Sequence, residues 1–342
     1  MKILIGIGHP ADVHFFRFFI QEMQRRGHAV VVVAREKDRV CFLLDQFQIP
    51  YHLIAFHQRG LLRKTLNYFI RWARTYRLCR RVRPDIALGV GDFYLPQIGK
   101  VSGFRSIVIT DTEPAVHDFL LTFPFASRIL TPFCYQRNLS RKQIRYNSYN
   151  ELAYLREHRF LPDPGIYQDL GIDDGEKYVL IRFCSRTAVH DIGRKGISEK
   201  MKKAVVEKFS RYARVFISSE PELPADLKAY QIPVSPEKIH HVIYYADLLY
   251  GESATMASEA ACLGTPAIYV DDRGRGYTDE QETKYGLVFN FSTALQDQRR
   301  AVEKGTAILA DAGGREKWRK KRERMVREKV DLVEFLGNMV ER

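Results

Sequence analysis

The chain has 342 residues, with 54 Lys and Arg against 41 Asp and Glu, which gives a formal net charge of +13. An apolar fraction of 45% and a charged fraction of 28% are typical of a soluble globular protein and exclude a largely disordered chain or a repeat solenoid. The length favours two domains, and no apolar run reaches the roughly 18 residues that a membrane span needs.

The positive charge is concentrated in two segments. No acidic residue occurs between Asp45 and Asp85, while nine Lys and Arg occur between Arg59 and Arg83. A second block, Arg315 to Lys329, holds nine basic residues against three acidic ones. Such blocks are either solvated faces or surfaces that contact nucleic acid, an anionic membrane or phosphorylated ligands.

The cysteines and the start of the chain indicate the compartment. The five cysteines are scattered without paired spacing, which indicates neither a disulfide framework nor a zinc site. The start, MKILIG, is too short an apolar stretch for a signal peptide and is typical of a first strand. We therefore expect a cytoplasmic protein.

The first part of the chain alternates apolar runs with helical spacing. A helix is expected after His9, closed by Gly27; Asp38 can cap a second helix, and a third is expected over 61–81. The expected strands are residues 3–7, 30–33, 51–54, 86–90 and 106–109. Strands alternating with helices predict a parallel, doubly wound sheet.

The same pattern restarts after the proline-rich stretch 161–165, which suits a domain hinge. From Arg315 onward we expect one long polar helix that ends in an apolar stretch. The expected elements are strands 178–183, 215–218, 248–250 and 267–270 and a helix over 199–209. We predict an α/β fold of two Rossmann-type domains facing across a cleft: 1–160, 161–320, and a helix, 321–342, that packs back on the first.

The run from Ala246 to Pro266 is the most informative stretch. A strand leads into a Gly/Ser/Thr turn at Gly251, a helix of small residues, and Gly-x-Pro before the next strand. Amide groups at the helix start, with the hydroxyls of Ser253 and Thr255, would hold a diphosphate. The Glu259 carboxylate could accept hydrogen bonds from a ribose. The alternative is an ordinary Ser/Thr N-cap.

Polar residues follow several strands of the first domain. A histidine at His9 or His14 could serve as general base on an acceptor hydroxyl, or could simply satisfy backbone groups in a turn. Asp92 and Glu113 follow neighbouring strands, whose ends converge in a doubly wound sheet. The other interpretation is that Asp92 and Asp111 cap the helices that follow.

The 246–266 run, with YTDEQE at 277–282, resembles the donor half of GT-B nucleotide-sugar enzymes. Relatives of this type include the N-acetylglucosaminyltransferase of the lipid-linked peptidoglycan precursor and the non-hydrolysing UDP-N-acetylglucosamine 2-epimerases. Nearly the whole chain resembles domain-of-unknown-function family 354. That resemblance is carried by IGHPA at 7–11, VHFF at 13–16, ELAYL at 151–155 and AVHDIG at 188–193.

The resemblance implies a GT-B fold and two alternative reactions. The 2-epimerases use carboxylates after first-domain strands and a histidine in the second domain, and Asp92, Glu113 and His190 look like counterparts. The Thr-Glu-Arg-x-Glu type run of those epimerases is replaced here by YTDEQ at 277–281, which is more transferase-like. In a transferase, Glu280 and Gln281 would contact the sugar.

The sequence also departs from these relatives. An acidic residue is expected before Ile-Gly-His, where this chain has Gly6, and an aromatic one after Ser185, where it has Arg186. Arg186 adds a cation near Ser185 at the phosphate site. Further arginines surround that site in the sequence and suit phosphate without a metal, although Arg is also common on surfaces: Arg182, Arg273 and Arg275. The chain has no Asp-x-Asp after a strand, so no metal is expected.

A helical projection of residues 61–81 separates two faces. The apolar face holds Leu62, Leu66, Phe69, Trp72, Ala73 and Tyr76, and the basic face holds Arg63, Lys64, Arg71, Arg74, Arg77 and Arg81. The basic face is either simply solvated or meets anionic lipid headgroups. No recognised nucleic-acid module is present, so nucleic acid is not an expected partner.

We therefore expect a metal-independent GT-B glycosyltransferase. It would transfer a sugar from a nucleotide-diphosphate donor, UDP-linked, to a cell-envelope or lipid-linked glycan acceptor. His14 would be the base, and the nucleotide sugar is a substrate, so no cofactor is needed. The alternatives are a UDP-N-acetylglucosamine 2-epimerase-like enzyme and a non-catalytic nucleotide-sugar-binding protein. The basic face of helix 61–81 further predicts that the protein lies peripherally on the inner face of the membrane.

Overall fold

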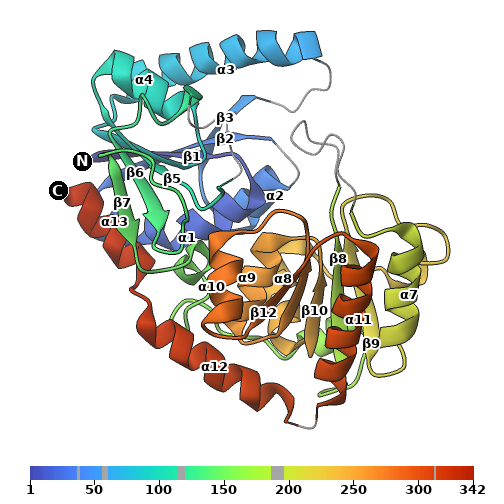
Figure 1. Cartoon of the computed structure of the whole chain (residues 1–342). Coiled ribbons are helices and arrows are strands. Elements are labelled where there is room, and N and C mark those ends of the chain that lie inside the picture. The colour runs from blue at the N-terminus through green and yellow to red at the C-terminus, as the bar shows by residue number, and fades with distance from the viewer. Residues whose placement is uncertain (37–38, 56–60, 114–119, 186–195, 312) are drawn as a thin grey trace. The chain divides into compact units, whose positions relative to one another are not determined.

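The computed structural model in Figure 1 describes residues 1–36, 39–55, 61–113, 120–185, 196–311 and 313–342. The chain divides into two compact units: unit 1 comprises Met1–Tyr154 and Lys329–Arg342, and unit 2 comprises Leu155–Glu328. The proline-rich stretch 161–165, predicted as the hinge, lies inside unit 2 because the chain leaves unit 1 already at Tyr154.

Unit 1 contains a seven-stranded parallel sheet in the order β3-β2-β1-β4-β5-β6-β7. Its strands are β1 (Lys2–Ile7), β2 (Ala29–Arg35), β3 (Tyr51–Ala55), β4 (Ile86–Val90), β5 (Arg105–Ile109), β6 (Arg128–Pro132) and β7 (Gln143–Tyr146). The doubly wound sheet expected from the alternating pattern is confirmed; β6 and β7 were not predicted.

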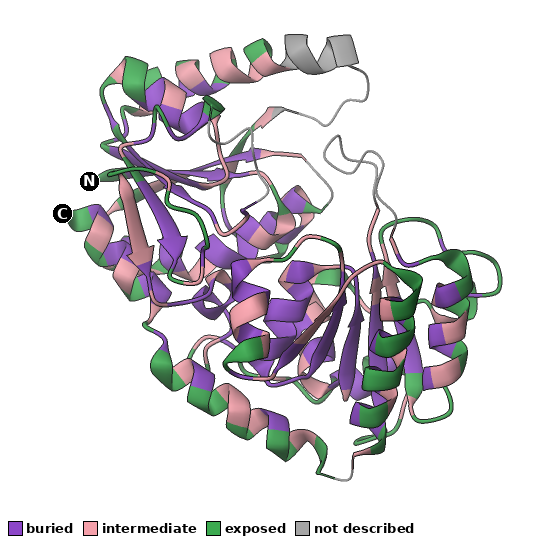
Figure 2. Cartoon of the chain, viewed as in Figure 1, coloured by how far each residue is buried: buried purple, intermediate pink, exposed green. Residues whose placement is uncertain are grey.

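Helices cover both faces of this sheet (Figure 1). α1 (Pro10–Arg25) and α2 (Val40–Gln46) lie on one face, and α3 (Leu61–Val82) and α4 (Tyr94–Ser102) lie on the other. A short 3-10 helix, η1 (Asn150–Ala153), contacts α1. Because both faces are covered, the strands are continuous apolar runs, and Ile3, Leu4 and Ile5 are all 0% exposed (Figure 2). Asp38, the predicted cap of α2, lies outside the described residues.

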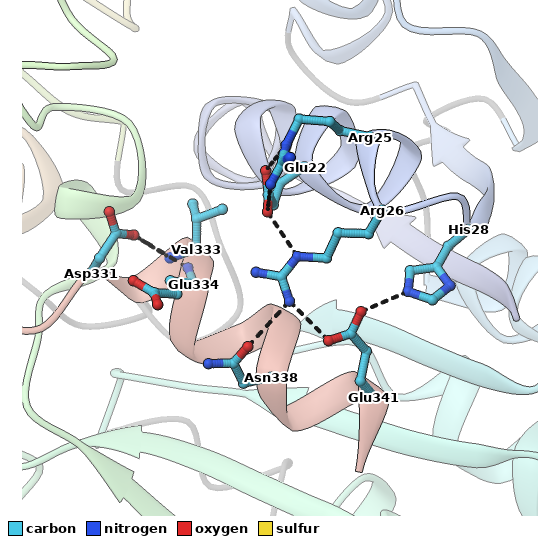
Figure 3. Close-up of polar contacts among 9 residues, drawn as sticks. All are labelled: Glu22, Arg25, Arg26, His28, Asp331, Val333, Glu334, Asn338 and Glu341. Carbon is cyan, nitrogen blue, oxygen red and sulfur yellow. Dashed lines mark hydrogen bonds and ion pairs between the residues drawn. The ribbon is translucent and has the colours of Figure 1, made fainter.

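The C-terminal segment forms two helices instead of the single one expected. α12 (Gly314–Glu328) belongs to unit 2, and α13 (Leu332–Glu341) belongs to unit 1. The break occurs because Asp331 caps a new helix, with its Oδ1 accepting the backbone N–H of Val333 at 3.0 Å and of Glu334 at 3.3 Å (Figure 3).

The last helix completes the packing of unit 1 on its α1 side. Arg26 Nη1 donates to Glu341 Oε2 at 2.9 Å and to Asn338 Oδ1 at 3.1 Å (Figure 3). A Cβ on Gly337 would lie 2.8 Å from Met23 Cε, so the two helices approach closely there. The buried side of α13 is formed by Leu332, Val333, Leu336, Gly337 and Val340.

Unit 2 contains a five-stranded parallel sheet in the order β12-β11-β10-β8-β9. Its strands are β8 (Tyr178–Phe183), β9 (Arg214–Ser219), β10 (Leu248–Gly251), β11 (Ala267–Val270) and β12 (Val288–Phe291). β8, β10 and β11 begin where they were predicted, and β12 was not predicted.

The helices of unit 2 again cover both faces of its sheet (Figure 1). α7 (Glu199–Phe209) and α11 (Leu295–Ala310) lie on one face; α8 (Ile239–Tyr245), α9 (Ala254–Leu263) and α10 (Gly276–Thr283) lie on the other. α12 packs against α9, where Arg322 Nε donates to the Cys262 carbonyl at 2.9 Å. The short elements are α6 (Ile166–Leu170), η3 (Lys228–Tyr230) and η4 (Pro236–Lys238).

The predicted apolar face of helix α3 is confirmed in part, since Trp72 and Tyr76 pack against the core of unit 1. Of its side chains described from Tyr68 onward, the packed stripe runs through Tyr68, Trp72, Thr75 and Cys79, a spacing of four, three and four residues. Phe69 was assigned to the packed face, but it is 64% exposed because it lies one residue beyond this stripe. No helix among the described residues is long and apolar enough to cross a membrane.

Candidate functional site

The turn from β10 into α9 lies at the carboxyl edge of the unit 2 sheet, where ligands of open α/β folds bind. Ser253 is the N-cap of α9, and its Oγ accepts the Met256 backbone N–H at 3.3 Å. The Ser/Thr cap considered for this turn is therefore present. Thr255, two residues after Ser253, is half-buried in the first turn of the same helix. This end of the helix provides the positive end of its dipole to an anion.

Gly251 brings the neighbouring strand β8 close to this turn. Gly251 pairs with Arg182 in the parallel register of β10 and β8. A Cβ on Gly251 would lie 2.9 Å from both Arg182 Cβ and the Arg182 backbone nitrogen, so a larger residue would separate the strands. Glycine is thus required by backbone packing, and it places Arg182 one strand away from Ser253.

Arg182 is the centre of a polar cluster at the ends of β8 and β9. Its Nη1 donates to Ser218 Oγ at 2.9 Å, and its Nη2 forms an ion pair with Glu220 Oε1. The other carboxylate oxygen of Glu220 accepts the Ser185 backbone N–H at 2.9 Å. One carboxylate therefore contacts both Arg182 of β8 and Ser185 just after it, the two groups that the sequence assigned to a phosphate.

Glu252 holds two parts of the chain together beneath this edge. It is 6% exposed, and its oxygens accept the backbone N–H of Cys184 at 3.1 Å and of Ile197 at 2.8 Å. Burial raises the pKa of the Cys184 thiol to about 12, so this cysteine is not a nucleophile at neutral pH. The predicted site residues Arg186 and His190 lie outside the described residues.

Glu259 and Gln281 connect the helices that surround α9. Glu259 Oε1 lies 2.9 Å from His240 Nε2, and both side chains are buried. Gln281 is 0% exposed, and its Nε2 donates to Ser258 Oγ at 2.8 Å. Glu280, next to it on α10, is half-buried. Sequence reasoning did not identify His240 as the partner of Glu259.

The two downstream arginines lie in the turn before α10. The Arg273 backbone N–H donates to Asp271 Oδ1 at 3.3 Å, and Arg275 is the N-cap of α10. Both side chains are half-buried. Among the described residues, no group of three or more His, Cys, Asp or Glu side chains is placed to hold a metal ion.

In unit 1, the two predicted histidines have different environments. His9 is the N-cap of α1, and its Nδ1 accepts the Ala11 backbone N–H at 3.2 Å, which is the backbone-satisfying role considered for it. His14 is 5% exposed and packs between the rings of Phe47 and Tyr154, with centroid distances of 5.5 and 5.6 Å.

Two aspartates and an arginine meet at the carboxyl edge of the unit 1 sheet. Asp12 Oδ2 accepts the backbone N–H groups of Gly8 and His9, both at 2.9 Å. Burial raises the pKa of Asp12 to about 7, against the opposing charge of Arg35. Arg35 Nε donates to the Gly8 carbonyl at 3.3 Å. Sequence reasoning missed both Asp12 and Arg35, although Asp12 stands at the third helical position, where an acidic residue completes a cap.

Asp92 belongs to the same edge. Its Oδ1 accepts the backbone N–H of Tyr94 at 2.8 Å and of Leu95 at 3.0 Å, so it caps α4 as one interpretation of the sequence had it. Burial raises the pKa of Asp92, and the charge of Arg35 opposes that rise. Capping leaves its second oxygen, Oδ2, directed over β1, close to Gly6.

Glu113 follows β5, the neighbour of the strand that Asp92 follows. It is 7% exposed, and its Oε1 accepts the Gln136 backbone N–H at 3.3 Å. Asp111, two residues earlier, accepts from Asn150 Nδ2 at 2.7 Å. Carboxyl groups thus follow two adjacent strands of unit 1: the half-buried Asp92 and the buried Glu113.

Solved structures with a similar fold include UDP-GlcNAc 2-epimerases and a glycosyltransferase by name. A UDP-GlcNAc 2-epimerase from Neisseria meningitidis, bound to UDP-GlcNAc, is 15% identical, with a TM-score of 0.70 over 93% of this chain and 94% of its own. A UDP-GlcNAc 2-epimerase from Methanocaldococcus jannaschii is 16% identical, with a TM-score of 0.64 over 96% and 99%. A spinosyn rhamnosyltransferase is 13% identical, with a TM-score of 0.64 over the full length of both chains. The chain therefore has a GT-B-like fold.

Similarity in sequence leads to proteins without an assigned activity. An uncharacterized protein of Methanocaldococcus jannaschii is 23% identical over 278 residues, which are 78% of this chain and 81% of that protein. The model of the family described as "Protein of unknown function (DUF354)" matches residues 1–276. The chain belongs to the DUF354 family.

Proposed function

We propose that the chain is a GT-B glycosyltransferase that transfers a sugar from a UDP-linked donor to a cell-envelope or lipid-linked glycan acceptor. The proposal is supported by a fold shared with enzymes whose names refer to UDP-sugars and glycosyl transfer. The observation that carries it concerns the carboxyl edge of the unit 2 sheet. There α9 begins just after β10, and Arg182 belongs to the neighbouring strand β8. Together they suit the two phosphates of a nucleotide-diphosphate donor.

In this proposal the donor's diphosphate binds at Gly251, Ser253 and Thr255 on one strand end, and at Arg182 and Ser185 on the next. The Glu259 carboxylate, which His240 orients, accepts hydrogen bonds from the ribose hydroxyls. Glu280 and Gln281 contact the sugar. A guanidinium stabilises the departing diphosphate without a proton transfer.

Calorimetry with UDP and UDP-N-acetylglucosamine tests the donor site. Arg182→Gln is expected to weaken UDP binding by about tenfold, because a charge-assisted hydrogen bond to phosphate is lost. Arg211→Gln is the matched control, since Arg211 is 64% exposed and pairs only with Glu207 on α7 among the described contacts. If the wild-type chain binds no nucleotide sugar, the proposal is wrong.

The acceptor's base is proposed at the edge of unit 1, where His14 and Asp92 are the two candidates. An imidazole titrates near neutral pH, and a carboxyl group with a raised pKa is also suited to general base catalysis. His14→Gln and Asp92→Asn distinguish them: loss of the lower limb of the pH–rate profile in one variant assigns the base to that residue.

A 2-epimerase is the second candidate, favoured by one observation in unit 1. Asp92 and Glu113 are carboxyl groups after adjacent strands, and an epimerase needs both an acid and a base to eliminate and re-add the nucleotide. Incubation with UDP-N-acetylglucosamine in deuterated water decides between the reactions. Deuterium at C2 without any acceptor favours the epimerase, and its absence, with transfer to a lipid-linked fraction, favours the transferase.

We further propose that α3 contacts an anionic membrane surface. No acidic residue occurs in α3 itself, and Phe69 and Ile70 are 64% and 39% exposed on this helix. Leu120 and Leu121, 76% and 43% exposed, belong to the same side of unit 1. A hydrogen-bond chain joins the two segments: Tyr68 OH donates to Gln97 Oε1 at 2.7 Å, and Gln97 Nε2 donates to the Leu121 carbonyl at 2.9 Å.

Flotation with neutral and with anionic liposomes tests this contact. Each arginine near the surface contributes on the order of 1 kcal/mol, so Arg77→Glu should reduce flotation only with anionic lipid. Phe69→Ser should reduce it further, whereas Leu295→Ser, at a residue 52% exposed on α11 of unit 2, should not. Equal flotation with both lipids would exclude the electrostatic contribution.

A further inference from the structure

The Glu220 carboxylate contacts the hydrogen-bond donors of Arg182 and Ser185 in the polar cluster at the ends of β8 and β9. One carboxylate oxygen pairs with Arg182 Nη2, and the other accepts the Ser185 backbone N–H at 2.9 Å. Each oxygen thus takes a different donor, one from the side chain and one from the backbone of the same strand end. A phosphate group uses the same two kinds of donor in the same way.

The sheet holds the Arg182 donor in place. Arg182 and Ser218 are register partners in β8 and β9, and Arg182 Nη1 donates to Ser218 Oγ at 2.9 Å. The Arg182 side chain is 19% exposed, whereas that of Glu220 is 44% exposed. The guanidinium is therefore fixed by the sheet, and the carboxylate is the part that solvent reaches and that can move.

We propose that this cluster is an anion site that takes a phosphate of the donor, and that Glu220 occupies it in the ligand-free chain. This inference rests on the proposed nucleotide-sugar function and adds to it a competition: the donor's phosphate displaces the Glu220 carboxylate from Arg182 and Ser185. Glu220 is then not a ligand of the donor. It lowers the affinity for the donor, because the donor's phosphate must displace the Glu220 carboxylate from the Arg182 guanidinium.

The competition predicts that removing the charge of Glu220 strengthens anion binding. Glu220→Gln is expected to raise the affinity for inorganic pyrophosphate and for UDP by about two- to fivefold, since a partly exposed ion pair is a weak competitor. Glu222→Gln is the matched control. It removes the same charge two residues away, where the side chain is 84% exposed and pairs with Lys228 at 2.9 Å. Its affinities should equal those of the wild type.

Calorimetry with pyrophosphate, UDP and UDP-N-acetylglucosamine on these variants is the test. Glu220→Ala serves as a second substitution, and urea unfolding verifies that each variant folds. A gain in Glu220→Gln and Glu220→Ala that disappears when Arg182→Gln is added supports the proposal. No gain, or an equal gain in Glu222→Gln, overturns it, as does a failure of any form to bind pyrophosphate. A pyrophosphate gain without binding of any UDP-sugar would retain the anion site and reject the nucleotide-sugar function. Binding of a UDP-sugar with no gain of affinity in Glu220→Gln would retain the nucleotide-sugar function and reject the competition by Glu220.

Discussion

Asp92 fills the space that a side chain at Gly6 would need: a Cβ on Gly6 would lie 2.6 Å from Asp92 Oδ2 and 2.8 Å from Leu95 Cδ1. An acidic residue was expected at this position of β1 by resemblance. In this chain the carboxylate near that point of the edge comes from the end of β4 instead, and the glycine makes room for it.

Gly6→Ala is therefore expected to destabilise the chain by about 1–3 kcal/mol, because the added methyl group overlaps a packed side chain. Urea unfolding measures this change. In an Asp92→Ala background the same substitution should cost less, since one of the two overlapping groups is gone and only Leu95 Cδ1 remains. Equal costs in the two backgrounds would show that Asp92 does not limit the residue at position 6.

The buried carboxyl group of Asp12 is expected to make stability depend on pH. Burial raises its pKa from 3.8 to about 7. Because the folded pKa lies above the unfolded one, the folded chain binds more protons between these values. Asp12 therefore contributes stability that is fully present below about pH 4 and lost as the pH rises to about 7. The free energy of unfolding of the wild type should fall over this range relative to Asp12→Asn.

Asp12→Asn is a conservative comparison, because a single oxygen, Oδ2, accepts both the Gly8 and His9 N–H groups and an amide oxygen can replace it. Unfolding by urea at several values between pH 4 and pH 8 provides the measurement. A difference between variant and wild type that stays constant with pH would contradict the raised pKa.

The pair formed by Glu259 and His240 is expected to stabilise unit 2. Both side chains are buried, at 7% and 3% exposure, so Glu259→Ala removes a hydrogen bond between two largely buried groups. We expect a loss of about 1–3 kcal/mol in the free energy of unfolding. Glu316→Ala, at a side chain 78% exposed in an i,i+4 pair with Lys320, should change stability by less than about 0.5 kcal/mol. Similar effects of the two substitutions would contradict a structural role for the buried pair.

Helix α13 is expected to carry much of the stability of unit 1. Leu336 is 0% exposed, and truncating such a side chain typically costs about 2–5 kcal/mol. Leu336→Ala should therefore strongly lower the free energy of opening of unit 1, which native-state hydrogen exchange measures. Glu334→Ala on the exposed side of the same helix is the control. Exchange in unit 2 should be unaffected by either, and a uniform change in both units would count against an independent role of α13.

Much of the fold could be predicted because it depends on local patterns. Strands such as β4 and β11 are continuous apolar runs, as parallel strands covered on both faces must be. β7 and β12 were missed because they are short and carry half-buried polar residues such as Gln143 and Asn290. The break before α13 had a signal that was overlooked: Asp331 followed three residues later by Glu334 is typical of a helix start.

The candidate site was predictable only where its contacts are local. Ser253 could be identified as a cap because a cap involves residues three apart. Glu220 lies 38 residues from Arg182, and their contact depends on β8 and β9 being neighbours, which no spacing in the sequence states. Glu252 and His240 were missed for the same reason, since their partners belong to other elements of the sheet's edge.

The order of the units along the chain has a consequence for synthesis. Unit 2 is one uninterrupted stretch, Leu155–Glu328, and α13 follows it but belongs to unit 1. During translation the ribosome therefore releases all of unit 2 before the residues that cover the α1 side of unit 1. The unit whose sheet is made first is therefore completed only after unit 2 has been made, because its α1 side stays uncovered until residues Lys329–Arg342 emerge.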